Sequence, residues 1–193
     1  MRLTLALIIM LMSTFMASGV PENKTLGPYN VSFDLNTTAN YSIIYAKPVE
    51  TPDSSTYMLL IKTNNSTLAN VAIVQFANRT DSTLSFGRLL AERSLIKNGF
   101  NRNMSSLDTE IDGKKGFIYA GINSKKLILF MIGYWLDSKD CDCGPVSVGN
   151  TKVEVISSYP PALTWNLLSS LHIEKTKLNE QQQPKALVFT PPK

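Results

Sequence analysis

Histidine and cysteine are scarce in this chain of 193 residues, which holds one histidine and two cysteines. The cysteines are Cys141 and Cys143, and the histidine is His172. A structural zinc site needs about four nitrogen or sulfur ligands, so the composition argues against one. No Gly-x-Ser-x-Gly elbow accompanies the histidine, so a hydrolase site of that kind is not indicated.

Charge is also sparse, because Asp, Glu, Lys and Arg make up 18% of the chain, against about 25% in an average domain. The formal net charge is +4, yet the basic residues form nothing larger than pairs such as Lys114-Lys115 and Lys125-Lys126. Nucleic-acid-binding proteins usually carry a basic stripe or face. The sequence therefore predicts no nucleic-acid partner.

Long apolar runs are confined to the N-terminus and one internal segment. Arg2 precedes a mostly apolar run from Leu3 to Met16, and Ala17-Ser18-Gly19 supplies small residues for cleavage. This pattern predicts a signal peptide over residues 1–19, and hence a secreted or extracytoplasmic protein with no membrane span after signal removal. An uncleaved signal would instead anchor the protein in the membrane.

The region behind this segment is rich in Asn-x-Ser/Thr, the acceptor sequence for N-glycosylation. One such sequon forms easily by chance, but several behind a signal peptide favour a glycoprotein of a secretory route. Eight sequons without a central Pro begin at Asn23, Asn30, Asn36, Asn40, Asn64, Asn65, Asn78 and Asn103.

The first half of the mature chain reads as strands after a polar lead-in over residues 20–27. Residues 29–35 alternate apolar and polar side chains, the period of a half-buried strand, so Asn30 and Ser32 are expected to point to solvent. A second short strand is expected over residues 41–45. The apolar segments 57–61 and 71–76 are joined by a connection too short for a parallel crossover, so they should pair antiparallel.

The clearest helical pattern covers residues 82–98, with Asp81 or Ser82 as N-cap and Gly99 suited to end the helix. Its apolar stripe is expected to pack on a sheet. The stripe consists of Phe86, Leu89, Leu90, Leu95 and Ile96, interrupted by Arg93.

The second half predicts a meander around the apolar segment 127–136. Ten uncharged residues are too few to span a bilayer, so the segment is interpreted as a central strand with both faces buried. Leu129 and, on the preceding strand, Ile118 should lie in the sheet centre. Asp112-Gly113 indicates a tight hairpin.

The chain after the meander predicts one more strand and one more helix. Val153 and Val155 alternate with charged residues, which favours a strand nearer the sheet edge. A helix over residues 162–171 is predicted from its leucine stripe and from the two prolines before it. Residues 176–193 are interpreted as a disordered tail.

Two-faced strands with one helix in mid-chain and another near the end predict an α+β fold. The expected architecture is a three-layer α/β/α sandwich with a mostly antiparallel sheet of about seven strands. It forms a single globular domain over residues 28–175.

With these elements in place, the chain resembles the Mog1/PsbP-like family over residues 28–174. The resemblance lies in Tyr29 to Leu35, the helix 82–98, the segment Gly113 to Tyr119, and Thr164 to Leu171. It implies the three-layer fold and, because that family is generally non-catalytic, a role in binding or assembly. It transfers no functional residues to this sequence.

The loop 137–150 holds the most unusual local motif, Cys141-Asp142-Cys143. A disulfide between the two cysteines fits an oxidising compartment; free thiols are a second interpretation. Asp137, Asp140 and Asp142 are a third, as weak calcium ligands, but their spacing matches no known calcium loop. No metal site is assigned. The loop is long for a strand connection, which marks it as a candidate contact surface.

The remaining polar candidates have structural interpretations that outweigh catalytic ones. His172 reads as a hydrogen-bonded residue at a helix end rather than a general base. Asp108, Glu110 and Asp112 read as solvated hairpin charges rather than an acid–base pair. Trp135 and Trp165 are expected in the core or between helix and sheet.

Together these features predict a secreted or cell-envelope, non-catalytic binding or assembly module with a protein or cell-envelope partner. No catalytic residue and no cofactor is assigned. One alternative is a secreted hydrolase whose site is assembled across the fold. The other is a small-ligand or metal carrier that uses the loop 137–150.

Overall fold

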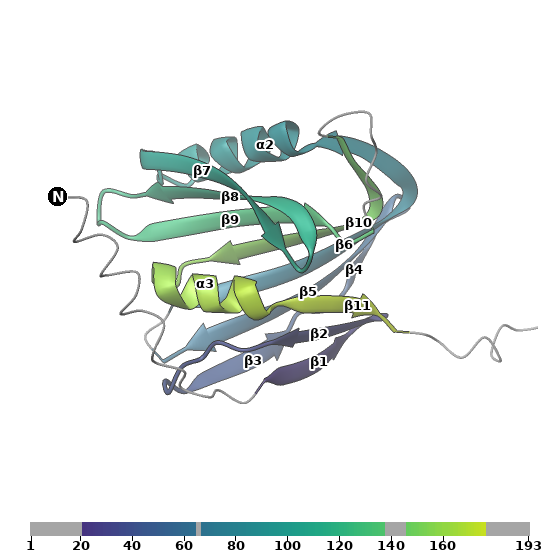
Figure 1. The fold of residues 1–193 in the computed structure, drawn as a ribbon, viewed down its shortest axis with the longest axis horizontal. Coiled ribbons are helices and arrows are strands. Elements are labelled where there is room, and N and C mark those ends of the chain that lie inside the picture. Colours follow the sequence, from purple (N-terminus) through teal and green to yellow (C-terminus); the bar gives the residue numbers. More distant parts are fainter. Residues whose placement is uncertain (1–20, 65–66, 138–145, 177–193) are drawn as a thin grey trace, which may run out of the picture.

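The computed structural model describes residues 21–64, 67–137 and 146–176. Within them the chain forms a mixed α+β domain with an eight-stranded sheet, a three-stranded sheet and two helices (Figure 1). Every strand pairing in both sheets is antiparallel. The predicted α+β class and the large antiparallel sheet are therefore confirmed.

The large sheet has the strand order β3-β5-β6-β10-β9-β8-β7, and β4 also pairs with β5. Its strands are β3 (Tyr41–Tyr45), β4 (Val49–Glu50), β5 (Ser54–Thr63), β6 (Leu68–Thr83), β7 (Arg102–Ile111), β8 (Lys114–Ile122), β9 (Ile128–Trp135) and β10 (Val146–Ser157). The small sheet has the order β1-β2-β11, with β1 (Glu22–Leu26), β2 (Tyr29–Phe33) and β11 (His172–Lys175). The helices are α2 (Leu84–Lys97) and α3 (Pro161–Ser170).

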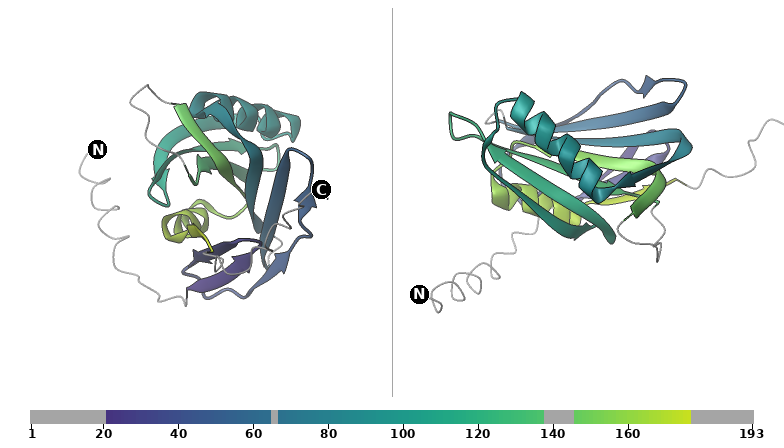
Figure 2. Two further views of the ribbon diagram at one scale, coloured as in Figure 1. Left: turned by 90° about the vertical axis from the view of Figure 1, so that its right-hand side faces the viewer. Right: turned by 90° about the horizontal axis from the view of Figure 1, so that it is seen from above.

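The main core lies between the large sheet, the small sheet and α3. The large sheet curves so that α3 and the small sheet lie against one face, while α2 lies on the other (Figure 2). Apolar side chains from β2, β5, β6, β9, β10, α3 and β11 fill the enclosed space. Its largest fully buried members are Tyr29, Phe33, Leu35, Leu59, Ile61, Ile73, Tyr134, Tyr159 and Leu167.

The small sheet contains two strands that the sequence pattern did not predict. β1 occupies most of the segment interpreted as a polar lead-in, and β11 follows α3 almost at once. Both pair with β2, so Asn30 and Ser32 lie on a middle strand. They are half-buried instead of pointing freely to solvent.

The centre of the large sheet is β10, not the strand at 128–135. Val153 and Val155 are fully buried in the core. Lys152 and Glu154 lie on the face toward α2, where their charged groups are 2.6 Å apart. The alternation interpreted as an edge signal therefore reflects two different faces of a central strand. Leu129 and Ile118, expected in the sheet centre, are only half-buried.

Helix α2 packs on β8 and β9 through a different face from the one predicted. Its buried residues are Gly87, Ala91 and Leu95, whereas much of the apolar stripe is exposed, with exposed fractions of 51% for Phe86 and 43% for Leu90. The small residues allow close approach, because a Cβ atom on Gly87 would lie 2.7 Å from the ring of Phe117.

The start of α2 differs from the prediction, whereas its end agrees with it. β6 runs through Thr83 directly into the helix at Leu84, so Asp81 and Ser82 belong to a strand and are not N-caps. At the other end Gly99 has φ +80°, and the Phe100 N–H donates to the carbonyl of Leu95 at 2.9 Å. This glycine-ended cap confirms the predicted end of the helix.

The predicted hairpin between β7 and β8 is confirmed. Asp112 and Gly113 both have positive φ, +53° and +67°, as a two-residue type I′ turn requires. This turn projects the Asp112 side chain from the end of the hairpin toward the small sheet. It thereby positions the first residue of the site described next.

Candidate functional site

A cavity of about 680 Å³ opens where the β7–β8 hairpin, the end of β9, the start of β10 and the small sheet meet. Its volume lies in the range of about 300–1,000 Å³ typical of ligand pockets. Most of its lining residues carry a polar group, and they come from segments far apart in the sequence. The lining residues are Tyr29, Gln75, Asp112, Lys114, Leu136, Asp137, Asn150, Thr151, His172, Ile173 and Lys175.

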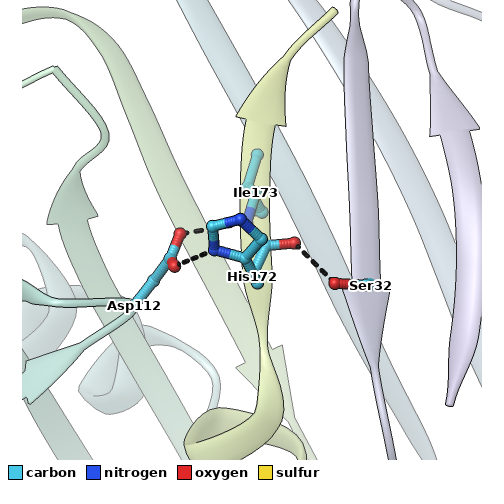
Figure 3. Close-up of polar contacts among 4 residues, drawn as sticks. All are labelled: Ser32, Asp112, His172 and Ile173. Carbon is cyan, nitrogen blue, oxygen red and sulfur yellow. Dashed lines mark hydrogen bonds and ion pairs between the residues drawn. The ribbon is translucent and has the colours of Figure 1, made fainter.

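Asp112 joins the hairpin to β11. Its side chain is only 7% exposed, and both carboxylate oxygens accept hydrogen bonds. Oδ1 lies 2.6 Å from Nδ1 of His172, and Oδ2 accepts the backbone N–H of Ile173 at 3.0 Å (Figure 3). The expectation that Asp112 is a solvated hairpin charge is therefore wrong, because the unpredicted strand β11 covers it.

His172 is the first residue of β11 and its side chain is 61% exposed. Because Nδ1 faces the Asp112 carboxylate, the ring is held in one orientation and Nε2 is the nitrogen left for other contacts. The prediction of a hydrogen-bonded histidine just after a helix is confirmed. Its partner, sixty residues away along the chain, was not foreseen.

Ser32 lies near this pair but does not complete a catalytic triad. In Figure 3, Ser32 and Asp112 lie on opposite sides of β11, and the imidazole ring is turned toward Asp112. The Ser32 hydroxyl donates to the backbone carbonyl of His172 at 3.5 Å and not to its ring. A nucleophilic serine has to hydrogen-bond the ring nitrogen that takes its proton, so this geometry does not activate Ser32.

Tyr134 lies beneath Asp112 and is 1% exposed. Burial, together with the nearby Asp112 carboxylate, raises the pKa of Tyr134 well above its usual value. Tyr134 therefore stays neutral and belongs to the support of the site rather than to its reactive surface.

Asp137 closes another side of the cavity by joining the end of β9 to β10. Its two carboxylate oxygens accept the backbone N–H groups of Asn150 and Thr151 at 2.9 and 3.0 Å. These bonds lie at the irregularity in the β6–β10 register between Gly149 and Thr151. A Cβ atom on Gly149 would lie 2.3 Å from Asp137 Oδ1, so the close approach depends on glycine.

The inner wall of the cavity is a buried polar group around Tyr29. The Tyr29 hydroxyl donates to Oε1 of Gln75 at 3.2 Å and lies 3.5 Å from Oγ1 of Thr151. The Tyr57 ring packs edge-on against it, with centroids 6.0 Å apart. Burial raises the pKa of Tyr29. The wall is therefore rigid and neutral.

Two lysines add positively charged groups to the lining of the cavity. Lys114 begins β8 directly after the turn, and Lys175 ends β11. Neither forms an ion pair with any residue that the structure describes, although both share the cavity with the two aspartates. The carboxylates are thus engaged by protein donors, whereas the ammonium groups are available to a ligand.

The other predicted acidic residues do not join this site. Asp108 forms an ion pair of 3.2 Å with Arg88 of α2, and Glu110 is exposed on β7. Cys141, Cys143, Asp140 and Asp142 lie outside the described residues, so the structure does not bear on a disulfide or a metal there. Asp137 and Asn150, the first and last residues of the predicted loop 137–150, do line the cavity.

The two tryptophans lie in different environments. Trp135 is buried, 4% exposed, and packs against Phe76 with ring centroids 6.0 Å apart. Trp165 is 52% exposed on α3, so its expected place in the core is wrong.

The sequons differ in accessibility. Asn30 is half-buried beside Glu174, and the Oδ1 atom of Asn36 is buried; Asn65 lies outside the described residues. The exposed sequon asparagines are Asn23, Asn40, Asn64, Asn78 and Asn103.

Asn64 lies at the β5–β6 turn, at one end of β6. Gln75, in the cavity lining, is seven residues along β6 from its first residue, Leu68, a span of about 23 Å. A glycan on Asn64 would therefore be attached at the far end of β6 from Gln75.

Sequence reasoning missed Tyr29, Gln75, Lys114, Thr151 and Lys175 as site residues. Each one sits in an ordinary strand pattern, and only strand pairing brings them together: β10 with β6 places Thr151 opposite Gln75, and β11 with β2 places Lys175 opposite Tyr29. The local signals that did exist were the Asp-Gly turn and a single histidine just after a helix. Nothing in the sequence linked the two.

No protein-family model, curated protein or solved structure matches this chain. Across residues 21–64, 67–137 and 146–176, no three His, Cys, Asp or Glu side chains are grouped so that they would hold a metal ion. In that same part of the chain, neither helix has the length and apolar character to cross a membrane.

Proposed function

We propose that this protein is an exported, non-catalytic binding module whose ligand site is the cavity beside Asp112 and His172. The observation that carries the proposal is the cavity itself, about 680 Å³ in volume and lined by polar groups on five strands and the turn between β7 and β8. Hydrogen bonds fix Asp112, Asp137 and Tyr29 before any ligand arrives. Such preorganisation lowers the cost of binding.

Export remains part of the proposal and rests on the N-terminal pattern of residues 1–19 and the eight sequons. The proposed architecture is the three-layer α/β/α sandwich of the Mog1/PsbP-like family. The positions of α2 and α3 on opposite faces of the large sheet support it. That resemblance also favours binding or assembly, with a ligand group offered by a protein or cell-envelope partner.

A hydrolase is the second candidate, and one observation favours it. A buried carboxylate holding a histidine by Nδ1 is the arrangement that orients the general base of Ser–His–Asp enzymes. Here no hydroxyl or thiol among the described residues lies at Nε2, and Ser32 bonds the backbone instead. Hydrolysis carried out by the described residues alone would therefore use a water molecule as the nucleophile.

Two assays on one preparation test the proposal. The purified protein is screened against a small-molecule mixture by ligand-observed NMR, and it is incubated with model carboxylic esters, phosphate esters and glycosides. A binding module gives saturable ligand signals and no turnover. Turnover that disappears in His172→Asn while the fold is retained would replace the proposal with the hydrolase. The absence of any bound molecule would reject the cavity as a ligand site.

A further inference from the structure

We propose, resting on the proposed function, that the cavity binds a small organic anion carrying a carboxylate or phosphate group. Both carboxylates of the cavity lining already accept hydrogen bonds from groups of the protein. Asp112 accepts two hydrogen bonds, from His172 and the Ile173 backbone. Asp137 accepts two more, from the Asn150 and Thr151 backbone. The negative groups of the lining are therefore committed to the fold.

The hydrogen-bond donors of the lining, in contrast, are largely left for a ligand. Lys114 is half-buried and Lys175 is exposed, and neither has an ion-pair partner within the described residues. His172 has one ring nitrogen bound to Asp112 and the other left over. Gln75 accepts the Tyr29 hydroxyl through Oε1, which leaves its amide N–H groups as donors. A ligand in the cavity thus meets the ammonium, imidazole and amide donors of these residues, beside the Asn150 and Thr151 side chains, which can both donate and accept.

The difference between engaged carboxylates and available donors favours some classes of ligand over others. A cation would need carboxylates that are free to turn toward it, and both are held. A neutral sugar needs acceptors as well as donors, because each hydroxyl has to be satisfied in both roles. An anion needs donors alone, and hydrogen bonds from charged donors to an anionic oxygen are about twice as strong as neutral ones.

The size and the apolar part of the lining indicate more than a bare inorganic ion. Leu136, Ile173 and the Tyr29 ring share the cavity with the polar groups. An organic body would lie against these side chains, while its anionic group would lie between the two lysines and His172. The lysines come from β8 and β11, so one ligand group would bridge the hairpin and the small sheet.

Isothermal titration at constant ionic strength tests the inference with four probes: inorganic phosphate, citrate, glucose and spermidine. We expect saturable binding of phosphate or citrate, and the stronger of the two identifies the preferred anionic group. The double variant Lys114→Gln/Lys175→Gln should bind it at least about tenfold more weakly. The matched control Lys62→Gln/Lys97→Gln removes the same charge from exposed positions on β5 and α2 and should bind as the wild type does.

The outcomes separate this inference from the proposed function. Anion binding that is equal in the wild type and the cavity double variant would overturn the inference, as would binding of glucose or spermidine in preference to both anions. In the second case the cavity would remain a ligand site of another class. Failure of all four probes, together with an empty small-molecule screen, would reject both.

Discussion

Asp112 is the residue on which the geometry of the site depends most. It occupies a turn position with positive φ, its side chain is almost fully buried, and it bonds both the ring and the following backbone N–H of β11. The burial of a charged group is tolerated when hydrogen bonds compensate it. Asp112 therefore couples the β7–β8 hairpin to the small sheet.

Asp112→Asn should lower the free energy of unfolding by about 1–3 kcal/mol, because one charge-assisted acceptor is lost in a buried position. Denaturant unfolding monitored by circular dichroism measures the change. Asp108→Asn is the matched control, since its ion pair with Arg88 is exposed and should contribute no more than about 1 kcal/mol. Similar small losses in both variants would contradict the structural role given to Asp112.

Among the structural elements, α2 shows why an apolar stripe does not always mark the buried face of a helix. Gly87 lets the helix approach the Phe117 ring closely, Ala91 is buried with it, and among the side chains described on α2 Leu95 is the one large buried residue. The larger residues Leu89 and Leu90 are left 39% and 43% exposed. The face of α2 that is buried is therefore the one that packs most closely on the sheet, not the one with the most apolar residues.

Leu95→Ala should cost about 2–5 kcal/mol of stability, because Leu95 is fully buried and the change leaves a cavity. Leu90→Ala on the exposed face should change stability by less than about 1 kcal/mol. Thermal or denaturant unfolding of the two variants compares them directly. A larger loss for Leu90→Ala would mean that α2 is rotated from the orientation described.

Features set by a short segment of this chain were predictable from the sequence, whereas features set by long-range strand pairing were not. The Asp112-Gly113 turn, the Gly99 helix end and the strand from Tyr29 were predictable, because each depends on a short segment and its backbone preferences. β11 was not, since four residues are too few for a periodic pattern. Without β11, neither the partner of His172 nor the cavity can be inferred from the sequence.

At the scale of the whole molecule, buried tyrosines make the folded state sensitive to alkali. Burial raises the pKa of Tyr159 to about 12. Burial, followed by the hydrogen bond to the Glu22 carboxylate, raises the pKa of Tyr41 to about 12 as well. Both hydroxyls titrate at 10.0 when unperturbed. The folded state therefore binds these protons more tightly than the unfolded chain does.

Stability from these groups should be fully present below pH 10 and lost as the pH rises from about 10 to about 12. Denaturant unfolding at a series of alkaline pH values measures the loss. Ultraviolet titration of the folded protein reports phenolate formation independently. The double variant Tyr41→Phe/Tyr159→Phe should lose less stability than the wild type over that range. An identical pH dependence in the two proteins would contradict the assignment.

In the domain as a whole, residues of the large sheet, the small sheet and the β7–β8 hairpin together line the cavity. Three segments remote in sequence meet there, and each contributes a fixed polar group. The proposed binding function is therefore a property of the assembled fold. The first and last residues of the loop 137–150, Asp137 and Asn150, are part of the cavity lining.

The central claim is that ligand enters this cavity, and blocking the cavity tests it most directly. Asn150 is half-buried in the lining, so Asn150→Trp should place an indole ring in the cavity and obstruct it, whereas Asn101→Trp adds the same ring at an exposed position between α2 and β7. Two-dimensional NMR titration with a ligand found in the screen is the measurement. We expect the signals of Thr151, His172 and Ile173 to shift in wild type and Asn101→Trp but not in Asn150→Trp. Equal shifts at these residues in both tryptophan variants, or ligand-induced shifts confined to other parts of the molecule, would contradict the account.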